Sequence, residues 1–472
     1  MPGQDMFLSK AATGIKGLDE ILDGGVPQGR TTLVCGSAGC GKTLLAAEFL
    51  VKGATMFDEP GVFMAFEETE KDLSENVLSL GYDLQVLIRE ERLLVDYVHI
   101  DRENIHETGE YDLEGLFIRL GHAIDTIGAR RVVLDTVESL FSGLPNTLIL
   151  RTELRRLFHW LKDRGVTAVI TGERGDGGLT RHGLEEYISD CVILLDHRVI
   201  EQVSTRRLRV VKYRGSTHGT NEYPFLIDHE GISVLPITSL ILEHAALGER
   251  ITTGIKKLDE MMGGKGYLRG SSILVSGTAG TGKTSFAAHF SEDRCKQGEG
   301  VLYFAFEESP DQIIRNMSSI GIDLKPQIDK GLLQFNATHP LLHGMEMHLV
   351  KILKEVDRFN PSIVIIDPIN AFIASGNEFE VRSMLTRLIN YLKERGVTAL
   401  FTSLTEFGTN LEYTKTAISS IIDTWLILRN TQIDNERKRE MYILKSRGMA
   451  HSNRVNEFLL TDRGVGLLIN DK

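Results

Sequence analysis

Short apolar segments alternate with longer amphipathic segments along the chain. In the first half, five apolar runs predict buried strands: TTLVC (31–35), VFMAF (62–66), VVLD (132–135), TAVI (167–170) and CVILL (191–195). Residues 152–165, TELRRLFHWLKDRG, carry apolar residues at helical spacing and end in glycine, which predicts a helix. This alternation predicts an α/β fold with a mostly parallel sheet flanked by helices. RRLRVVKYR (206–214) and EYPFLID (222–228) are instead typical of an antiparallel hairpin at the sheet edge.

The second half of the chain repeats the first. Residues 13–43, TGIKGLDEILDGGVPQGRTTLVCGSAGCGKT, match residues 253–284, TGIKKLDEMMGGKGYLRGSSILVSGTAGTGKT, and further matches follow in the same order. Lys283 lies 241 residues after Lys42, and Glu307 lies 240 residues after Glu67. Because this period is far longer than a solenoid repeat, each copy is a domain. We predict domains over residues 1–240 and 241–472, with a linker near 236–250.

Composition restricts the classes of protein that the chain can belong to. Of 472 residues, 42% are hydrophobic and 25% charged, which suits two folded domains rather than a disordered chain. We find no apolar run of ~18 residues and no secretory signal, so we expect no membrane association. Four cysteines without a CxxC pair indicate the reducing cytoplasm. A net charge of −12 argues against nucleic acid as a partner.

Two glycine-rich segments carry the strongest chemical signal. GSAGCGKT (36–43) and GTAGTGKT (277–284) both fit G-x-x-x-x-G-K-[ST], after a predicted strand and before a predicted helix. In this pattern backbone N–H groups surround phosphate, the lysine neutralises it and the threonine hydroxyl binds Mg²⁺. A glycine turn without a ligand is the alternative, which two copies in the same context disfavour. The predicted ATP-binding residues here are Gly39, Cys40, Gly41, Lys42, Thr43, Leu44, Gly280, Thr281, Gly282, Lys283, Thr284 and Ser285.

Acidic residues follow the apolar strands of both halves. Asp135 and Asp367 end the runs VVLD and IVIID, where an acid orders the magnesium ion together with Thr43 and Thr284. Two Glu-Glu pairs also follow strands, and a carboxylate there could activate water or a hydroxyl. The alternatives are a surface acid after a core strand and an acidic first turn of a helix. The four candidate catalytic residues are Glu67, Glu68, Glu307 and Glu308.

A basic segment, KxRGxxH, is also present in both halves. A solvated strand would explain one copy, but two copies favour a cationic role toward phosphate, supplied from a neighbouring subunit. This predicts nucleotide at a subunit boundary. The residues are Lys212, Arg214 and His218 in the first half and Lys445, Arg447 and His451 in the second.

Together these motifs resemble the KaiC family of RecA-like ATPases over nearly the whole chain. The resemblance implies tandem RecA-like P-loop domains in a homohexameric double ring, with ATP between subunits. It implies ATP hydrolysis in the first half and a serine/threonine autokinase, with the reverse autophosphatase activity, in the second. Glu67 and Glu68 then position water, Glu307 activates the acceptor hydroxyl, and Ser79 contacts the base side of the nucleotide.

The resemblance also assigns phosphoacceptors. The family's acceptor segment reads ISSIIDT (418–424) here, so the acceptors carry over to Ser419 and Ser420, and a nearby family threonine aligns with Thr414. The first half has EEYISD (185–190) at this place, with Glu186 and Tyr187 in place of the hydroxyl pair. We therefore expect self-phosphorylation in the second half only.

The chain departs from the family pattern in three ways. Pro368 follows Asp367, where Ser or Thr is usual, and Ile320 replaces an aromatic residue used against adenine. The chain ends at Lys472, before the tail that KaiA grips, which argues against KaiA as a partner. Two alternatives stay open: a nucleic-acid motor of the RadA or DnaB kind, and a nucleotide-gated scaffold for a KaiB-like protein.

Overall fold

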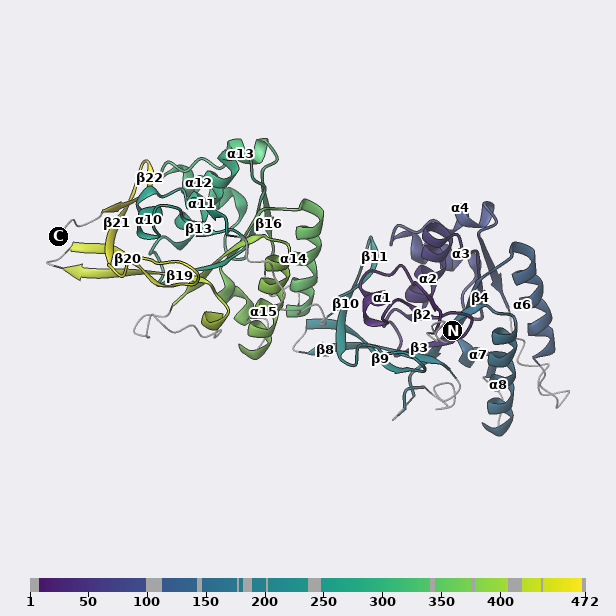
Figure 1. The fold of residues 1–472 in the computed structure, drawn as a ribbon. Helices are drawn as coiled ribbons and strands as arrows, with labels where there is room; N and C mark the ends of the chain where they lie inside the picture. The colour runs from purple at the N-terminus through teal and green to yellow at the C-terminus, as the bar shows by residue number, and fades with distance from the viewer. Residues whose placement is uncertain are drawn as a thin grey trace, which may run out of the picture. The chain divides into compact units, whose positions relative to one another are not determined.

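The computed structural model describes residues 8–98, 113–141, 147–175, 178–180, 189–200, 203–236, 248–339, 344–374, 378–405, 418–433 and 436–468. Contacts divide the chain into two compact units, Met1–Thr238 and Ser239–Lys472 (Figure 1). Most of the predicted linker, residues 237–247, lies outside the described ranges.

The first unit contains one nine-stranded sheet, in the order β11-β10-β9-β8-β3-β7-β6-β4-β5. Its strands are β3 (Thr31–Gly36), β4 (Gly61–Ala65), β5 (Leu93–Tyr97), β6 (Arg131–Asp135), β7 (Thr167–Glu173), β8 (Cys191–Ile200), β9 (Val203–Tyr213), β10 (Glu222–Asp228) and β11 (Gly231–Val234). A small sheet pairs β1 (Lys10–Ala11) with β2 (Val26–Pro27). The helices are α1 (Leu18–Ile21), α2 (Lys42–Phe57), α3 (Glu70–Leu78), α4 (Leu84–Arg89), α6 (Glu114–Ile127), α7 (Val137–Phe141) and α8 (Thr147–Asp163).

The second unit repeats this sheet in the order β16-β15-β17-β18-β14-β19-β20-β21-β22. Its strands are β14 (Ser272–Gly277), β15 (Val301–Ala305), β16 (Leu333–Ala337), β17 (Ile363–Asp367), β18 (Thr398–Leu404), β19 (Thr424–Ile433), β20 (Glu436–Ser446), β21 (Asn456–Thr461) and β22 (Gly464–Leu468), with β12 (Arg250–Ile251) paired to β13 (Tyr267–Leu268). The helices are α10 (Lys256–Met261), α11 (Lys283–Lys296), α12 (Pro310–Ser318), α13 (Lys325–Asp329), α14 (Met345–Phe359) and α15 (Glu378–Glu394), with 3-10 turns η2 (Ile369–Ala374) and η3 (Ile418–Ser420).

Strand directions confirm the predicted fold class. The six strands β5, β4, β6, β7, β3 and β8 run parallel, and β9, β10 and β11 continue the sheet in antiparallel fashion. The hairpin segments predicted at 206–214 and 222–228 form this antiparallel edge. The predicted helix at 152–165 lies mostly within α8.

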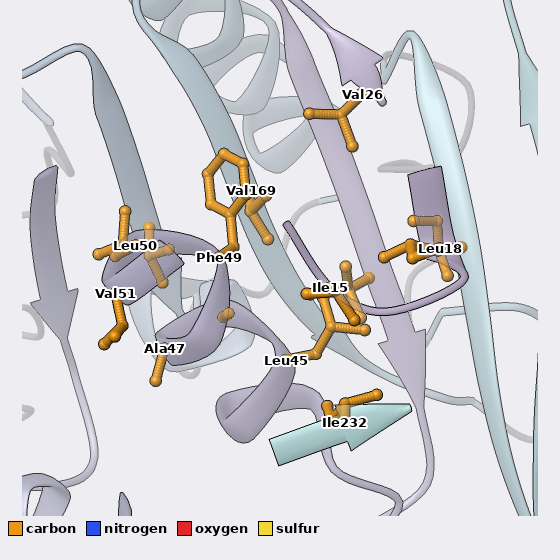
Figure 2. Close-up of a cluster of buried hydrophobic side chains, with 14 of the residues drawn as sticks. Ile15, Leu18, Val26, Leu45, Ala47, Phe49, Leu50, Val51, Val169 and Ile232 are labelled. Atoms are coloured by element: carbon orange, nitrogen blue, oxygen red, sulfur yellow. The ribbon is translucent and has the colours of Figure 1, made fainter. Parts of the chain in front are cut away.

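Alternating strand residues fill two cores on opposite faces of the first sheet. Phe63 and Val133 pack with α2, α3 and α4, whereas Val62 and Val132 pack with α6 and α8. Such alternation follows from the two-residue period of a strand. Figure 2 shows part of the α2-side core, with Phe49 of α2 in the same cluster as Val169 of β7. The sheet therefore fixes the start of α2, and with it the phosphate loop.

No helix in the described ranges has the length and apolar character needed to cross a membrane.

Arg131 is a buried charge that ties three segments of the first unit together. It is 1% exposed, and its Nε donates to Glu59 Oε2 at 2.7 Å. Its other nitrogens donate to the carbonyl oxygens of Phe49 at 2.9 Å and Ala12 at 2.8 Å. The corresponding residue of β17 is the apolar Ile363, which shows that the fold does not require a charge here.

We expect Arg131→Met to destabilise the first unit by about 3–5 kcal/mol, because it leaves a carboxylate and two carbonyl groups without their donor. Urea unfolding followed by Trp160 fluorescence, in a Trp425→Phe background, would report on the first unit. Arg30→Met is the control, since its ion pair is looser at 3.6 Å and partly exposed. Equal midpoints for the two variants would contradict the prediction.

Candidate nucleotide sites

Each phosphate loop joins the end of a central strand to the start of a helix. The first runs from β3 into α2 and the second from β14 into α11. Gly41 and Gly282 immediately precede the helices with φ of 106° and 97°, a conformation that favours glycine. A Cβ on Gly41 would also lie 2.8 Å from the side chain of Ile227. Backbone N–H groups at such a helix start suit a bound phosphate.

The loop lysines are held at the same place in both halves. Nζ of Lys42 donates to two loop carbonyl oxygens, both at 3.1 Å, and Nζ of Lys283 does the same at 3.0 Å. Burial lowers the pKa of Lys283, and the carboxylates of Asp367 and Glu307 oppose this change. Both ammonium groups therefore stand at the loop, where they can bind a phosphate oxygen.

The remaining predicted loop residues fill the turn and the first helical turn. Cys40 is fully buried, and burial raises the pKa of its thiol, so it acts as an unreactive filler. In the second loop Thr281 takes this position, and its hydroxyl donates to the carbonyl of Thr278 at 2.9 Å. The other predicted members are Gly39, Leu44, Gly280 and Ser285. All four cysteines of the chain are buried and free.

The first half brings its two predicted metal residues together. Thr43 Oγ1 donates to Asp135 Oδ2 at 2.9 Å, and Thr171 donates to Oδ1 of the same carboxylate. Burial raises the pKa of Asp135, although these two hydroxyl groups oppose it. A hydroxyl beside a carboxylate is an oxygen donor set of the kind that Mg²⁺ prefers when it also binds nucleotide phosphates. The residues present thus fit this ion.

The second half arranges its metal residues differently. Asp367 Oδ1 accepts from Thr402, as in the first half, but Oδ2 accepts from the hydroxyl of Tyr303 at 2.5 Å. In the part of the chain that the structure describes, no hydrogen bond joins Thr284 to Asp367. Burial and the neighbouring Asp367 carboxylate raise the pKa of Tyr303 well above its ordinary value, so this phenol is a proton donor.

The first glutamate of each pair also differs between the halves. Ser139 Oγ donates to Glu67 Oε1 at 2.6 Å and lies 3.4 Å from Thr136 Oγ1. Glu307 has no hydrogen-bond partner among the described residues. Partial desolvation and the Asp367 carboxylate raise the pKa of Glu307. Ser139 corresponds to Ala371, so the second half lacks the hydroxyl that binds Glu67, and Pro368 also lacks the hydroxyl that Thr136 places 3.4 Å from Ser139.

The second glutamate of each pair is held alike by an asparagine. Asn76 Nδ2 donates to Glu68 Oε2 at 3.2 Å, and Asn316 makes the same contact with Glu308 at 3.2 Å. Ser79, the residue that follows α3, donates to the Asn76 carbonyl at 3.1 Å. Our sequence reasoning missed both asparagines, although their matching positions in the repeat were a usable signal.

The predicted basic residues and the phosphate loop of the same half lie at opposite ends of the central strand. Arg214 N donates to Asp190 O, and Asp190 N donates to Thr31 O at the start of β3. The phosphate loop follows Gly36 at the other end of this strand, about 16 Å away at ~3.3 Å per residue. The structure thus separates Lys212, Arg214 and His218 from Lys42.

The second half repeats this separation and includes the predicted acceptor segment in it. Arg447 N donates to Asp423 O and its Nη2 donates to Ser420 O at 2.6 Å. Asp423 also binds Ser272, the first residue of β14. Lys445 precedes this turn on β20, and His451 follows it. Ser420 is exposed and therefore lies at the same end as Arg447, one strand length from Lys283.

Thr414, Glu186 and Tyr187 lie outside the described residues, as does the side chain of Ser419.

Comparison with known proteins connects these sites to one family. A family model described as the KaiC ATPase matches residues 11–239 and 251–472. The chain is 59% identical over 467 residues to "Circadian clock protein KaiC2" of Synechocystis sp. (strain ATCC 27184 / PCC 6803 / Kazusa), covering 98% of this chain and 82% of that protein. It is 38% identical to "Circadian clock oscillator protein KaiC" of Acaryochloris marina (strain MBIC 11017), covering 97% and 88%. The protein of that name from Thermosynechococcus vestitus (strain NIES-2133 / IAM M-273 / BP-1) is 39% identical, covering 97% and 89%.

Proposed function

We propose that this chain, which belongs to the KaiC family of ATPases, hydrolyses ATP in residues 1–240 and phosphorylates its own serines with ATP in residues 241–472. Two phosphate loops with equivalent lysine contacts support nucleotide binding in both halves. The different activities that we propose for the two halves are supported by the different contacts of the first glutamate of each pair. Glu67 is held by Ser139, whereas Glu307 has a raised pKa and no such contact among the described residues.

In the first half, Glu67 and Glu68 would orient the attacking water, each through one carboxylate oxygen. Their hydrogen bonds to Ser139 and Asn76 restrict the positions that these carboxylates can take. Lys42 would neutralise the phosphates. Thr43 and Asp135 would hold Mg²⁺, which supplies charge neutralisation between the phosphate groups. This arrangement favours water as the acceptor.

In the second half, Glu307 would accept the proton of a serine hydroxyl while the serine oxygen bonds to the γ-phosphorus. The bond from that phosphorus to the β-phosphate oxygen breaks, and ADP leaves. Burial lowers the pKa of the Lys283 ammonium group and the negative charge of Glu307 opposes this change, because the two charges attract each other. Lys283 would bind the transferred phosphate. Thr284 and Asp367 would hold the ion there. The same residues serve the reverse transfer from phosphoserine to ADP, the proposed autophosphatase route.

The acceptors that we propose are Ser419 and Ser420, and the phosphate donor would be bound by another copy of the chain. Ser420 lies one strand length, about 16 Å, from its own phosphate loop, whereas reacting atoms must approach to about 3–3.5 Å. Arg447 and Lys445 lie at the same end and would contact that nucleotide in trans. This separation supports a ring, which we propose to be a homohexamer.

The similar proteins are named as circadian clock proteins, and we propose that this chain acts as a clock or signalling regulator. A KaiB-like protein is the partner that this role would require.

The test is incubation of the full chain with ATP and Mg²⁺, followed by intact mass and phosphopeptide mapping of residues 414–424. We expect phosphate on this segment in the wild type and in Lys42→Ala, and none in Lys283→Ala. Because each lysine variant disables one phosphate loop, the pair shows which of the two nucleotide sites supplies the phosphate. Hydrolysis of ATP by the wild type without phosphate on this segment would overturn the autokinase, and native mass would test the hexamer.

A further inference from the structure

The two aspartates that end β6 and β17, Asp135 and Asp367, differ in which group binds their second oxygen. Oδ1 accepts from an equivalent threonine in each half, Thr171 or Thr402, so the two carboxylates are oriented alike. Oδ2 of Asp135 accepts from Thr43, the predicted metal ligand of the phosphate loop. Oδ2 of Asp367 accepts from Tyr303 instead. A buried phenol thus donates the hydrogen bond to Oδ2 that the loop threonine donates in the first half.

The phenol comes from a position that the two halves place at the same point of a matched strand pair. Phe63 pairs with Val133 across β4 and β6, and Tyr303 pairs with Ile365 across β15 and β17. In each case the aspartate follows two residues later on the second strand. Phe63 and Tyr303 are both buried, at 1% and 0% exposure, on the face that packs against the phosphate-loop helix. At this position the two halves therefore differ by the tyrosine hydroxyl.

The ring of Tyr303 is fixed by packing. It lies against Phe335 of β16, with 4.9 Å between ring centroids. Phe335 is half-buried on the edge strand β16, but Tyr303 itself lies on the interior strand β15 and is fully buried, so its hydroxyl has little freedom to leave Asp367. The carboxylate oxygen is thus held by a donor that would not bind the metal, whereas Thr43 would be both donor and ligand.

We propose that Tyr303 is a positioning residue that draws Asp367 away from Thr284 and so gives the second nucleotide site a higher Mg²⁺ requirement than the first. This rests on the metal role given to Thr284 and Asp367 under the proposed function. A carboxylate oxygen that accepts a strong hydrogen bond from a phenol is a weaker acceptor for metal-bound water or for the threonine hydroxyl. Removal of the phenol hydroxyl frees that oxygen for both.

Two reciprocal substitutions test this. Tyr303→Phe gives the second site the first site's side chain, and Phe63→Tyr does the reverse. We expect Tyr303→Phe, in a Lys42→Ala background, to lower the Mg²⁺ concentration that half-saturates binding of a non-hydrolysable ATP analogue by roughly three- to tenfold. Phe63→Tyr, in a Lys283→Ala background, should raise it by a similar factor. Calorimetric titration of the full chain measures binding without turnover.

Asp367→Asn in the Lys42→Ala background separates the inference from its premise. If this variant leaves the Mg²⁺ requirement unchanged, the metal role of Asp367 fails and the inference with it. If Asp367→Asn raises the requirement but Tyr303→Phe leaves it unchanged or raises it, only the role of Tyr303 is overturned. A thermal melt of each variant checks folding, and the Phe63→Tyr arm decides the question should Tyr303→Phe not fold.

Discussion

Replacing Glu307 with Gln should reduce phosphate transfer to the Ser419–Ser420 segment by roughly 10²–10⁴-fold, the usual contribution of a general base. Glutamine keeps the size of the side chain but cannot accept the serine proton. Binding of ATP should persist, because Lys283 keeps both loop carbonyl contacts. Phosphate incorporation measured over time, at saturating ATP and Mg²⁺, gives the rate.

Glu308→Gln is the matched control. Its carboxylate is already occupied by Asn316 Nδ2 at 3.2 Å, so we expect a much smaller loss. Equal losses in the two variants, or full activity of Glu307→Gln, would contradict the assignment of the base.

The pH dependence provides a second measure of the same residue. Desolvation and the Asp367 carboxylate raise the pKa of Glu307. A base acts in its deprotonated form, so the transfer rate should rise with pH along a limb above the ordinary glutamate range near ~4.3. This limb should be absent from the residual activity of Glu307→Gln.

Features that the two halves share could be predicted from the sequence. The fold class and the antiparallel hairpin at the sheet edge follow from the pattern of apolar and amphipathic segments, whereas the strand order came from the structure. The phosphate loops and the two aspartates were visible because each occurs twice with the same spacing. Thr171 and Thr402, and Asn76 and Asn316, had the same signal and were missed only because these residue types often occur as neutral surface or core residues.

Features that distinguish the halves could not be predicted in this way. Ser139 corresponds to Ala371, Tyr303 to Phe63 and Arg131 to Ile363. Because the residue differs between the repeats, comparison of the repeats does not mark these positions as functional. Each acts through a contact with a residue distant in the chain, such as Glu67, Asp367 or Glu59. Sequence periodicity places a side chain on a face, but it does not determine what that side chain contacts. The contacts that distinguish the two halves at these positions therefore had to come from the structure.

Mixing two inactive variants should restore phosphorylation. A Lys283→Ala chain has intact acceptors but a defective second phosphate loop, and a Ser419→Ala/Ser420→Ala chain has the opposite defect. If the acceptor segment is served by the loop of a neighbouring copy, the Lys283→Ala chain should gain phosphate only in the mixture. The geometric reason is the strand length of about 16 Å between the two ends of β14, which no side-chain rotation of a serine can cover.

One variant carries a mass tag, so that the two chains of the mixture can be told apart. Phosphopeptide mapping then shows which chain carries phosphate. Each variant alone is the control and should carry no phosphate on residues 418–424. Native mass spectrometry of the same sample shows whether the two chains share assemblies. Mixed assemblies without phosphate on the Lys283→Ala chain would rule out transfer in trans and would require β14 and the acceptor segment to rearrange within one domain. Phosphate on that chain would instead mean that the active site is formed by two neighbouring copies of the ring, since neither copy contains the whole site.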